Sequence, residues 1–164
     1  MKYMGSKARH AKELLPIILK DHTPDMWYVE PFVGGANMID KVDPIIAPKR
    51  LGCDVHEYLI PMLHAASGGW MPPKEVSEED YKFVKSNKDT DKALTGYIGF
   101  SMSFGGKWFG GYRRDSTGKR DYALESYRSA AKQFWQLRNI YFRSKSVFDI
   151  DFTRFGDRKS TRLN

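Results

Sequence analysis

Two short apolar stretches, each ended by an acidic residue, are the strongest constraint on how this chain folds. Residues 26–29 are apolar and lead into Glu30-Pro31 and then Gly34-Gly35. Residues 50–54 also have strand character and again end in an acid. Helical patterns precede, separate and follow these stretches, at residues 6–19, 36–42 and 56–66. This alternation predicts an α/β fold in which helices cover a parallel sheet.

The chain changes character after residue 69. Ser77-Glu78-Glu79-Asp80 resembles a capping sequence that opens a helix. Further helices are predicted over residues 92–100 and 122–137, and residues 104–118, with five glycines, predict a loop or irregular hairpin. Residues 140–142 return to strand character. We therefore expect a mainly helical insertion, over about 70–135, into an α/β domain.

Composition narrows the function classes. With 164 residues and 41% hydrophobic residues, the chain is long and apolar enough to bury one core. No apolar run approaches the roughly 20 residues that cross a bilayer, and the basic N-terminus lacks the apolar segment of a signal peptide. Cys53 is the single cysteine, which excludes an internal disulfide and a cysteine-based zinc cluster. A cytoplasmic protein with no membrane partner and no metal is the expectation.

Positive charge is concentrated in one segment. The net charge is +7, and five basic residues stand between Lys107 and Arg120 against one acid, Asp115. Trp108, Phe109 and Tyr112 are interleaved with them. Total charge alone fits either a soluble basic protein or a phosphate-binding surface, but this local clustering favours contact with nucleic acid.

The two strand-ending acids suit a nucleotide-like ligand. An acid, a glycine turn and a helix at the carboxyl edge of a sheet allow the backbone to approach a ligand closely, although the dinucleotide pattern G-x-G-x-x-G is not matched. The same stretch also fits an ordinary strand-to-helix turn. Asp54 follows Glu30 by a little over 20 residues, a spacing at which an acid accepts hydrogen bonds from ribose hydroxyls. Asp54 is equally placed to cap the helix predicted at His56, and the two roles are compatible.

Three motifs in order carry a family resemblance. Lys2-Tyr3-Met4-Gly5-Ser6-Lys7, then residues 30–35 (EPFVGG), then Gly52-Cys53-Asp54 are together similar to the opening of Dam-type adenine-N6 DNA methyltransferases. The resemblance extends to about Gly156. It implies an incomplete Rossmann-like, S-adenosylmethionine-dependent methyltransferase sheet with an inserted target-recognition domain. The implied divisions are cofactor-binding residues 1–69, recognition residues 70–135, and a return to the sheet over 136–156.

The resemblance also implies a set of cofactor contacts. Lys7 suits the carboxylate of S-adenosylmethionine by its charge and reach, Asp54 would bind the ribose, and an aromatic-containing segment near Ser146 would pack on the adenine. Phe148 stands beside Val147, where the family commonly has its aromatic residue. The implied cofactor-binding residues are Tyr3, Lys7, Glu30, Phe32, Gly34, Gly35, Asp54, Ser146 and Val147.

Residues 99–114 resemble the recognition loop of the family. Lysine and arginine neutralise phosphates, arginine reads guanine edges, and aromatic side chains wedge into a base stack. A flexible, glycine-rich surface hairpin is the alternative interpretation. The implied contacts to double-stranded DNA are Ser101, Ser103, Lys107, Trp108, Phe109, Arg113 and Arg114.

The catalytic motif of the family, D-P-P-Y, is absent. The sole Pro-Pro pair, Pro72-Pro73, is flanked by Met71 and Lys74 and precedes the recognition segment. Residues 157–164 lack apolar periodicity and are similar to the translation of a sequencing-adapter read, so we interpret them as a non-native tail. We expect the native gene to continue from near Gly156 into the catalytic strand.

The expected function of the intact protein is site-specific transfer of a methyl group from S-adenosylmethionine to N6 of adenine, by a monomer. The fragment is expected to be inactive alone, with no catalytic residue assigned. One alternative is a non-catalytic DNA-binding module, whose affinity for duplex DNA does not need the cofactor. Another is a small α/β enzyme that uses a different nucleotide. The absence of the dinucleotide pattern and the presence of the Tyr3–Lys7 motif argue against this second alternative.

Overall fold

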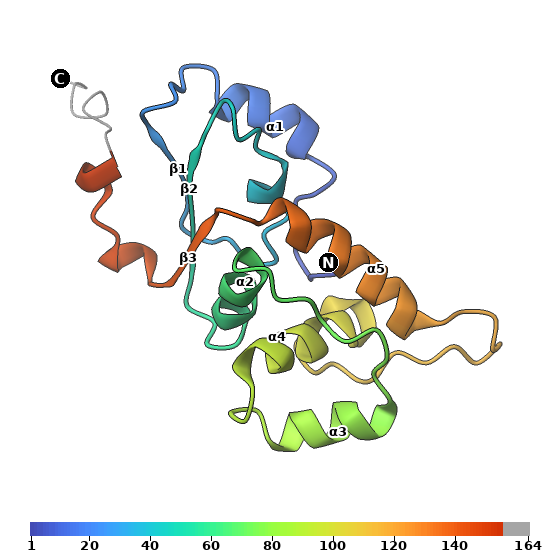
Figure 1. The fold of residues 1–164 in the computed structure, drawn as a ribbon. Helices are drawn as coiled ribbons and strands as arrows, with labels where there is room; N and C mark the ends of the chain where they lie inside the picture. Colours follow the sequence, from blue (N-terminus) through green and yellow to red (C-terminus); the bar gives the residue numbers. More distant parts are fainter. Residues whose placement is uncertain (156–164) are drawn as a thin grey trace.

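The computed structural model describes residues 1–155, which form a mixed α/β fold with a small parallel sheet. The strands are β1 (Trp27–Glu30), β2 (Lys49–Asp54) and β3 (Tyr141–Ser144). Five α-helices accompany them in these residues: α1 (Ala11–Ile18), α2 (Leu59–Ser67), α3 (Glu78–Ser86), α4 (Lys92–Ser101) and α5 (Tyr122–Gln136). Helices α3, α4 and α5 all stand between β2 and β3 in the chain (Figure 1).

The sheet brings the strand-ending acids to one edge. Its order is β1-β2-β3, and both strand pairs are parallel. Glu30 at the end of β1 pairs with Gly52, and Asp54 at the end of β2 pairs with Ser144 at the end of β3. The expected parallel α/β arrangement is therefore confirmed, with the carboxyl ends of all three strands on the same side.

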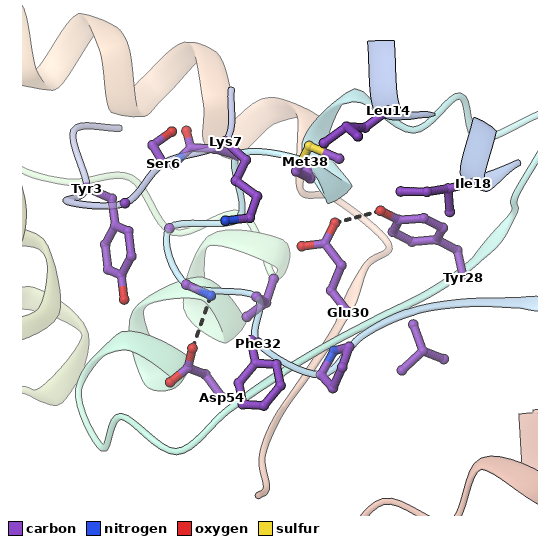
Figure 2. Close-up of a pocket in the computed structure, with 17 residues that line it drawn as sticks. Tyr3, Ser6, Lys7, Leu14, Ile18, Tyr28, Glu30, Phe32, Met38 and Asp54 are labelled. Atoms are coloured by element: carbon purple, nitrogen blue, oxygen red, sulfur yellow. Dashed lines mark hydrogen bonds between the residues drawn. The ribbon is translucent and has the colours of Figure 1, made fainter. Parts of the chain in front are cut away.

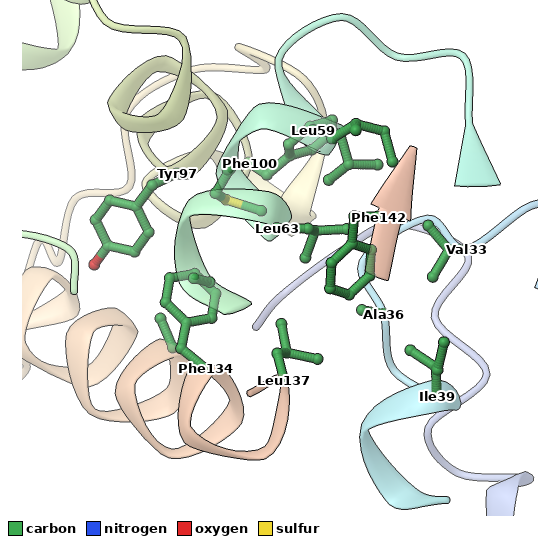
Figure 3. Packing of buried hydrophobic residues seen from close by; sticks show 14 of the residues in the cluster. Val33, Ala36, Ile39, Leu59, Leu63, Tyr97, Phe100, Phe134, Leu137 and Phe142 are labelled. Carbon is green, nitrogen blue, oxygen red and sulfur yellow. The ribbon is translucent and has the colours of Figure 1, made fainter. Parts of the chain in front are cut away.

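One buried cluster unites the two halves of the chain. Helix α2 packs against β3 on one side and against α4 on the other. The core contains side chains from the glycine turn, from α2, α4 and α5, and from β3 (Figure 3): Val33, Ala36, Ile39, Leu59, Leu63, Tyr97, Phe100, Phe134, Leu137 and Phe142. The helical segment predicted as an insertion thus shares its core with the segment that precedes it.

A second, smaller cluster covers the opposite face of the sheet. Leu51 and Cys53 of β2 flank Gly52, which faces the other way, because a Cβ atom on Gly52 would meet Val33 and Phe142 of the main core. Ile150 is buried with them, and Trp27, Val29 and Phe155 pack against the group. Residues 147–155 therefore lie on the face of the sheet that α2 leaves free.

Two predicted helices differ in the structure. The helix expected from Ser6 begins at Ala11, because Gly5 has a left-handed backbone (φ 82°) and Met4 is hydrogen-bonded to the carbonyl of Gly106. The helix expected over residues 36–42 is one 3-10 turn, Ile39–Lys41. Ala36 has φ 55°, and Pro44 disfavours helical backbone at the residue before it.

The predicted start of α2 is also shifted, from His56 to Leu59. The ring Nδ1 of His56 accepts hydrogen bonds from the backbone N–H groups of Tyr58 and Leu59, at 3.3 and 3.2 Å. His56 thus accepts the free backbone N–H groups at the start of α2, which is the capping role that the sequence predicts for Asp54. The helices predicted at residues 92–100 and 122–137 are confirmed within one residue at each end.

Two structural observations concern membranes and metal ions. In residues 1–155, no helix combines the length and apolar character needed to cross a membrane. The same residues contain no group of three or more His, Cys, Asp or Glu side chains that could hold a metal ion. The predicted tail, residues 157–164, lies outside the described residues, as does Gly156 at the end of the predicted third segment.

The capping sequence generates a stability prediction. Ser77 Oγ accepts the backbone N–H of Asp80 at 3.0 Å, and the Asp80 carboxylate accepts the backbone N–H of Ser77 at 2.9 Å. We expect Ser77→Ala to lower the free energy of unfolding by about 1 kcal/mol. Ser129→Ala, on an exposed position of α5, is the matched control and should leave it unchanged or raise it by up to about 0.5 kcal/mol, through the higher helix propensity of alanine, in the same urea titration. Equal stabilities for the two variants would show that the cap contributes nothing.

Candidate functional site

A cavity of about 520 Å³ lies at the carboxyl edge of the sheet (Figure 2). It is formed by the N-terminal segment, α1, the end of β1 with its glycine turn, and the end of β2. Its volume is in the range of small-molecule sites in proteins. Seven of the nine predicted cofactor residues line it: Tyr3, Lys7, Glu30, Phe32, Gly34, Gly35 and Asp54.

The glycine turn is shaped by Tyr3, which lies directly on it. A Cβ atom on Gly35 would come within 2.6 Å of the Cβ of Tyr3, and one on Gly34 within 2.9 Å of its ring. Gly34 also has a left-handed backbone, with φ 49°. Glycine is therefore required here, because any side chain would displace Tyr3 from the wall of the cavity.

Asp54 joins the two loops that border the cavity. Its Oδ2 accepts the backbone N–H of Gly34 at 3.0 Å, and its Oδ1 accepts the backbone N–H of His56 at 3.1 Å. A carboxylate offers about four acceptor positions, so each oxygen keeps capacity for a ligand hydroxyl. Burial lowers the pKa of His56, which favours the neutral ring that its acceptor role at α2 needs.

Glu30 is the second acid of the cavity. The hydroxyl of Tyr28 donates to its Oε1 at 2.8 Å. Burial raises the pKa of Glu30 to about 7, and the hydrogen bond from Tyr28 opposes this shift only in part. A cationic ligand group beside Glu30 would replace the lost hydration and favour the charged carboxylate.

Lys7 completes the set of charges. Figure 2 shows its side chain reaching over the cavity between Tyr3 and Met38, with Glu30 and Asp54 below it. Two acids and one amine around one hollow can hold a ligand that carries hydroxyls, a cation and an anion. A nucleoside linked to an amino acid has these groups.

Several lining residues were not predicted. Tyr28 lies two positions before Glu30, so the period-2 alternation of a strand could have placed both side chains on the same face. The apolar wall is formed by Leu14, Ile18 and Met38. Leu14 and Ile18 lie four positions apart in α1, so helical periodicity could have placed them on one face, whereas Met38 has no such signal. Asn37 lines the cavity too, next to the glycine turn.

Ser146 and Val147, the predicted adenine contacts, are not among the lining residues. Ser146 instead caps a 3-10 turn, Val147–Asp149, by accepting the backbone N–H of Phe148. The ring of Phe148 is 94% exposed. This segment follows β3, and the backbone N–H of Lys145 donates to the Asp54 carbonyl at 3.0 Å, so the segment borders the same edge without lining the cavity.

Four of the seven predicted DNA contacts are buried: Ser101, Ser103, Phe109 and Arg113. Ser103 Oγ bonds to the hydroxyl of Tyr81 and to the carbonyl of Gly99, which ties the hairpin to α3 and α4. Arg113 is 8% exposed, donates to Ser126 Oγ at 3.0 Å and lies 4.2 Å from the centre of the Tyr122 ring. In this conformation these four side chains hold residues 99–114 against the neighbouring helices rather than present a surface.

The remaining three predicted contacts are accessible to different degrees. Lys107 and Arg114 are exposed, and Arg114 forms a bidentate ion pair with Glu78 of α3. Trp108 is half-buried, stacked on Tyr58 at 5.3 Å and edge-on to His56 at 4.5 Å. Trp108 is thus packed against the residues that follow Asp54.

No model of a protein family matches this chain, and no curated protein is similar to it at a significant level. The function proposed below therefore depends on the motifs and on the geometry of the cavity.

The raised pKa of Glu30 predicts a pH dependence of stability. A carboxyl whose pKa rises from 4.5 to about 7 on folding destabilises the fold as pH climbs through that interval. Relative to Glu30→Gln, the unsubstituted chain should lose roughly 3 kcal/mol of unfolding free energy between pH 4.5 and 8. Glu79→Gln, at an exposed position of α3, should show the same pH profile as the unsubstituted chain. Parallel profiles for all three proteins would rule out a perturbed Glu30.

Proposed function

We propose that this chain is the cofactor-binding and DNA-binding part of a site-specific adenine-N6 DNA methyltransferase that uses S-adenosylmethionine. The main support is the position of four side chains. Tyr3, Lys7, Glu30 and Asp54, from three separate motifs of the sequence, line the same cavity at the carboxyl edge of a parallel sheet. That edge is where open α/β sheets bind nucleotide-like ligands.

The charges of the cavity fit the groups of S-adenosylmethionine. Asp54 would accept the ribose hydroxyls with the acceptor positions that Gly34 and His56 leave free. Glu30 would face the cationic part of the methionine portion, and Lys7 its carboxylate. Phe32, 74% exposed beside the cavity, and the ring of Tyr3 offer apolar surface to the rest of the ligand.

When bound, S-adenosylmethionine would supply an activated methyl group for transfer to the exocyclic nitrogen of a flipped adenine. The residues of this chain would bind and orient the cofactor and hold the DNA. No acid-Pro-Pro-aromatic sequence stands among the 164 residues, since Pro72-Pro73 lies between Met71 and Lys74. We therefore propose cofactor and DNA binding for this chain, without methyl transfer by it alone.

The DNA-binding part of the proposal is supported by the exposed cations of the recognition segment. Lys107, Arg114, Lys119 and Arg120 are all exposed. Arg114 and Arg120 are paired with Glu78 and Glu125, but exposed ion pairs are weak and can be exchanged for phosphates. The buried network of Arg113 and Ser103 would keep the hairpin rigid beneath them.

Cofactor binding has a direct test. Isothermal titration calorimetry with S-adenosylmethionine should detect binding to the unsubstituted chain, weakened at least about tenfold by Asp54→Asn through the loss of charge-assisted hydrogen bonds. The affinity should fall by up to about tenfold for each pH unit below 7, because Glu30 then becomes protonated. Glu30→Gln should abolish this pH dependence.

Asp21→Asn, an exposed change outside the cavity, is the control and should bind like the unsubstituted chain. Equal affinities for Asp54→Asn and Asp21→Asn would contradict the assignment of the ribose acid. A complete absence of heat with S-adenosylmethionine at pH 8, in a folded sample, would refute the proposed cofactor.

DNA contact is tested by salt dependence. For each lost phosphate contact, the slope of log affinity against log salt concentration should become shallower by about 0.9. We expect this shallower slope for Lys107→Gln and for Arg114→Gln with duplex DNA. We expect an unchanged slope for Lys20→Gln, because Lys20 is an exposed lysine just after α1. Identical slopes for all of these proteins would exclude the hairpin as the DNA-binding surface.

A non-catalytic DNA-binding module is the second candidate, favoured by the missing acid-Pro-Pro-aromatic sequence. It predicts the same salt dependence but no binding of S-adenosylmethionine. The calorimetric titration therefore separates the two.

A further inference from the structure

The N-terminal segment lies between the cavity and the recognition segment. The backbone N–H of Met4 donates to the carbonyl of Gly106 at 3.2 Å. A Cβ atom on Gly106 would come within 2.9 Å of the Tyr3 backbone nitrogen and 3.0 Å of its Cα. The loop backbone at Gly106 therefore touches the backbone of Tyr3 with no space for a side chain.

Tyr3 is in equally close contact with the cavity on its other side. Its side chain covers Gly34 and Gly35, where added Cβ atoms would lie 2.9 and 2.6 Å from it. Its ring centre also lies 5.1 Å from that of Phe100 in α4. One residue thus forms part of the cavity wall and contacts both the loop and the helix that precedes it.

A second set of contacts connects the cavity with the same loop. Asp54 accepts the backbone N–H of His56, and the His56 ring packs edge-on against Trp108 at 4.5 Å between centres. Trp108 stands two positions after Gly106 in the same loop. Both Tyr3 and Asp54, which line the cavity, are therefore braced by the segment from Ser103 to Tyr112.

We propose that Gly106 is a positioning residue for the cavity and that the loop 103–112 and the cavity form one coupled unit. A ligand that fixes Tyr3 and Asp54 thereby fixes the loop, so that binding at the cavity raises the affinity of the loop for DNA, and DNA raises the affinity of the cavity by the same factor. This inference rests on the proposed function, because it takes S-adenosylmethionine and duplex DNA as the two ligands.

Gly105 offers a matched control for Gly106. Both glycines have left-handed backbones, with φ of 65° and 70°, so alanine introduces similar strain at either position. A Cβ on Gly105 meets nothing within 4 Å, whereas one on Gly106 pushes against Tyr3. The pair therefore separates contact with the N-terminal segment from backbone strain.

The experiment measures the dissociation constant of a duplex with and without saturating S-adenosylmethionine, together with that of S-adenosylmethionine alone. For the unsubstituted chain and for Gly105→Ala we expect the cofactor to tighten DNA binding by at least about fivefold, the lower end of common allosteric couplings. For Gly106→Ala we expect the cofactor to bind about tenfold more weakly and the coupling factor to fall toward one. A loss of stability alone would leave the coupling factor of the folded fraction unchanged.

Met4 provides a second pair of variants in case Gly106→Ala does not fold. Met4→Pro removes the N–H that bonds to Gly106 without adding an atom to the loop, and Met4→Ala retains that N–H at an exposed side chain. We expect the coupling to be lost in Met4→Pro and kept in Met4→Ala.

Equal coupling in Gly106→Ala and Gly105→Ala, or in both Met4 variants, would overturn the inference while leaving the proposed function intact. If the unsubstituted chain binds both ligands without any coupling, the inference also fails alone. If it binds no S-adenosylmethionine, the proposed function itself fails, and the coupling with it.

Discussion

The carboxylate of Asp54 is the interaction on which the cavity depends. It holds the glycine turn through Gly34 and the start of the next connection through His56, and both bonds need a charged or acceptor-only side chain at the end of β2. The parallel pairing of β1 with β2 brings Glu30 to the same edge. Tyr3 then closes the site from the N-terminal side, because glycine at residues 34 and 35 leaves room for it. The geometry of the cavity thus follows from the Asp54 carboxylate, the register of β1 against β2, and the glycines at residues 34 and 35.

The elements with local signals could be predicted from the sequence. Both strands that end in acids, the helix capped by Ser77 and the long helix α5 lie where periodicity and capping residues indicate. Because parallel strands align their carboxyl ends, the predicted cofactor residues at the ends of β1 and β2 line one cavity, which Tyr3 and Lys7 complete from the N-terminal segment. Elements controlled by distant contacts were harder to place. Helix α1 starts five residues late because Met4 is held by Gly106, about a hundred residues away in the chain.

Residues 99–114 show why residue chemistry alone misjudges exposure. Arginine, serine and phenylalanine next to glycines are typical of a DNA-binding loop, yet Arg113, Ser103 and Phe109 are buried by α3 and α5. Their burial depends on helices that the loop meets only in the folded chain. Ser146 and Val147 likewise follow the expected strand, but Ser146 caps a 3-10 turn that begins at Val147, and neither residue lines the cavity. In each case, tertiary packing decided which side chains remain available for a ligand.

We propose that the cavity between Tyr3, Glu30 and Asp54 binds a nucleoside joined to an amino acid. The decisive experiment is a crystal structure of the chain grown with S-adenosylmethionine. The claim predicts ribose hydroxyls within hydrogen-bond distance of the Asp54 carboxylate and the amino-acid end between Lys7 and Glu30. Clear density for the ligand at another place, or a cavity that contains only water at saturating ligand, would contradict it.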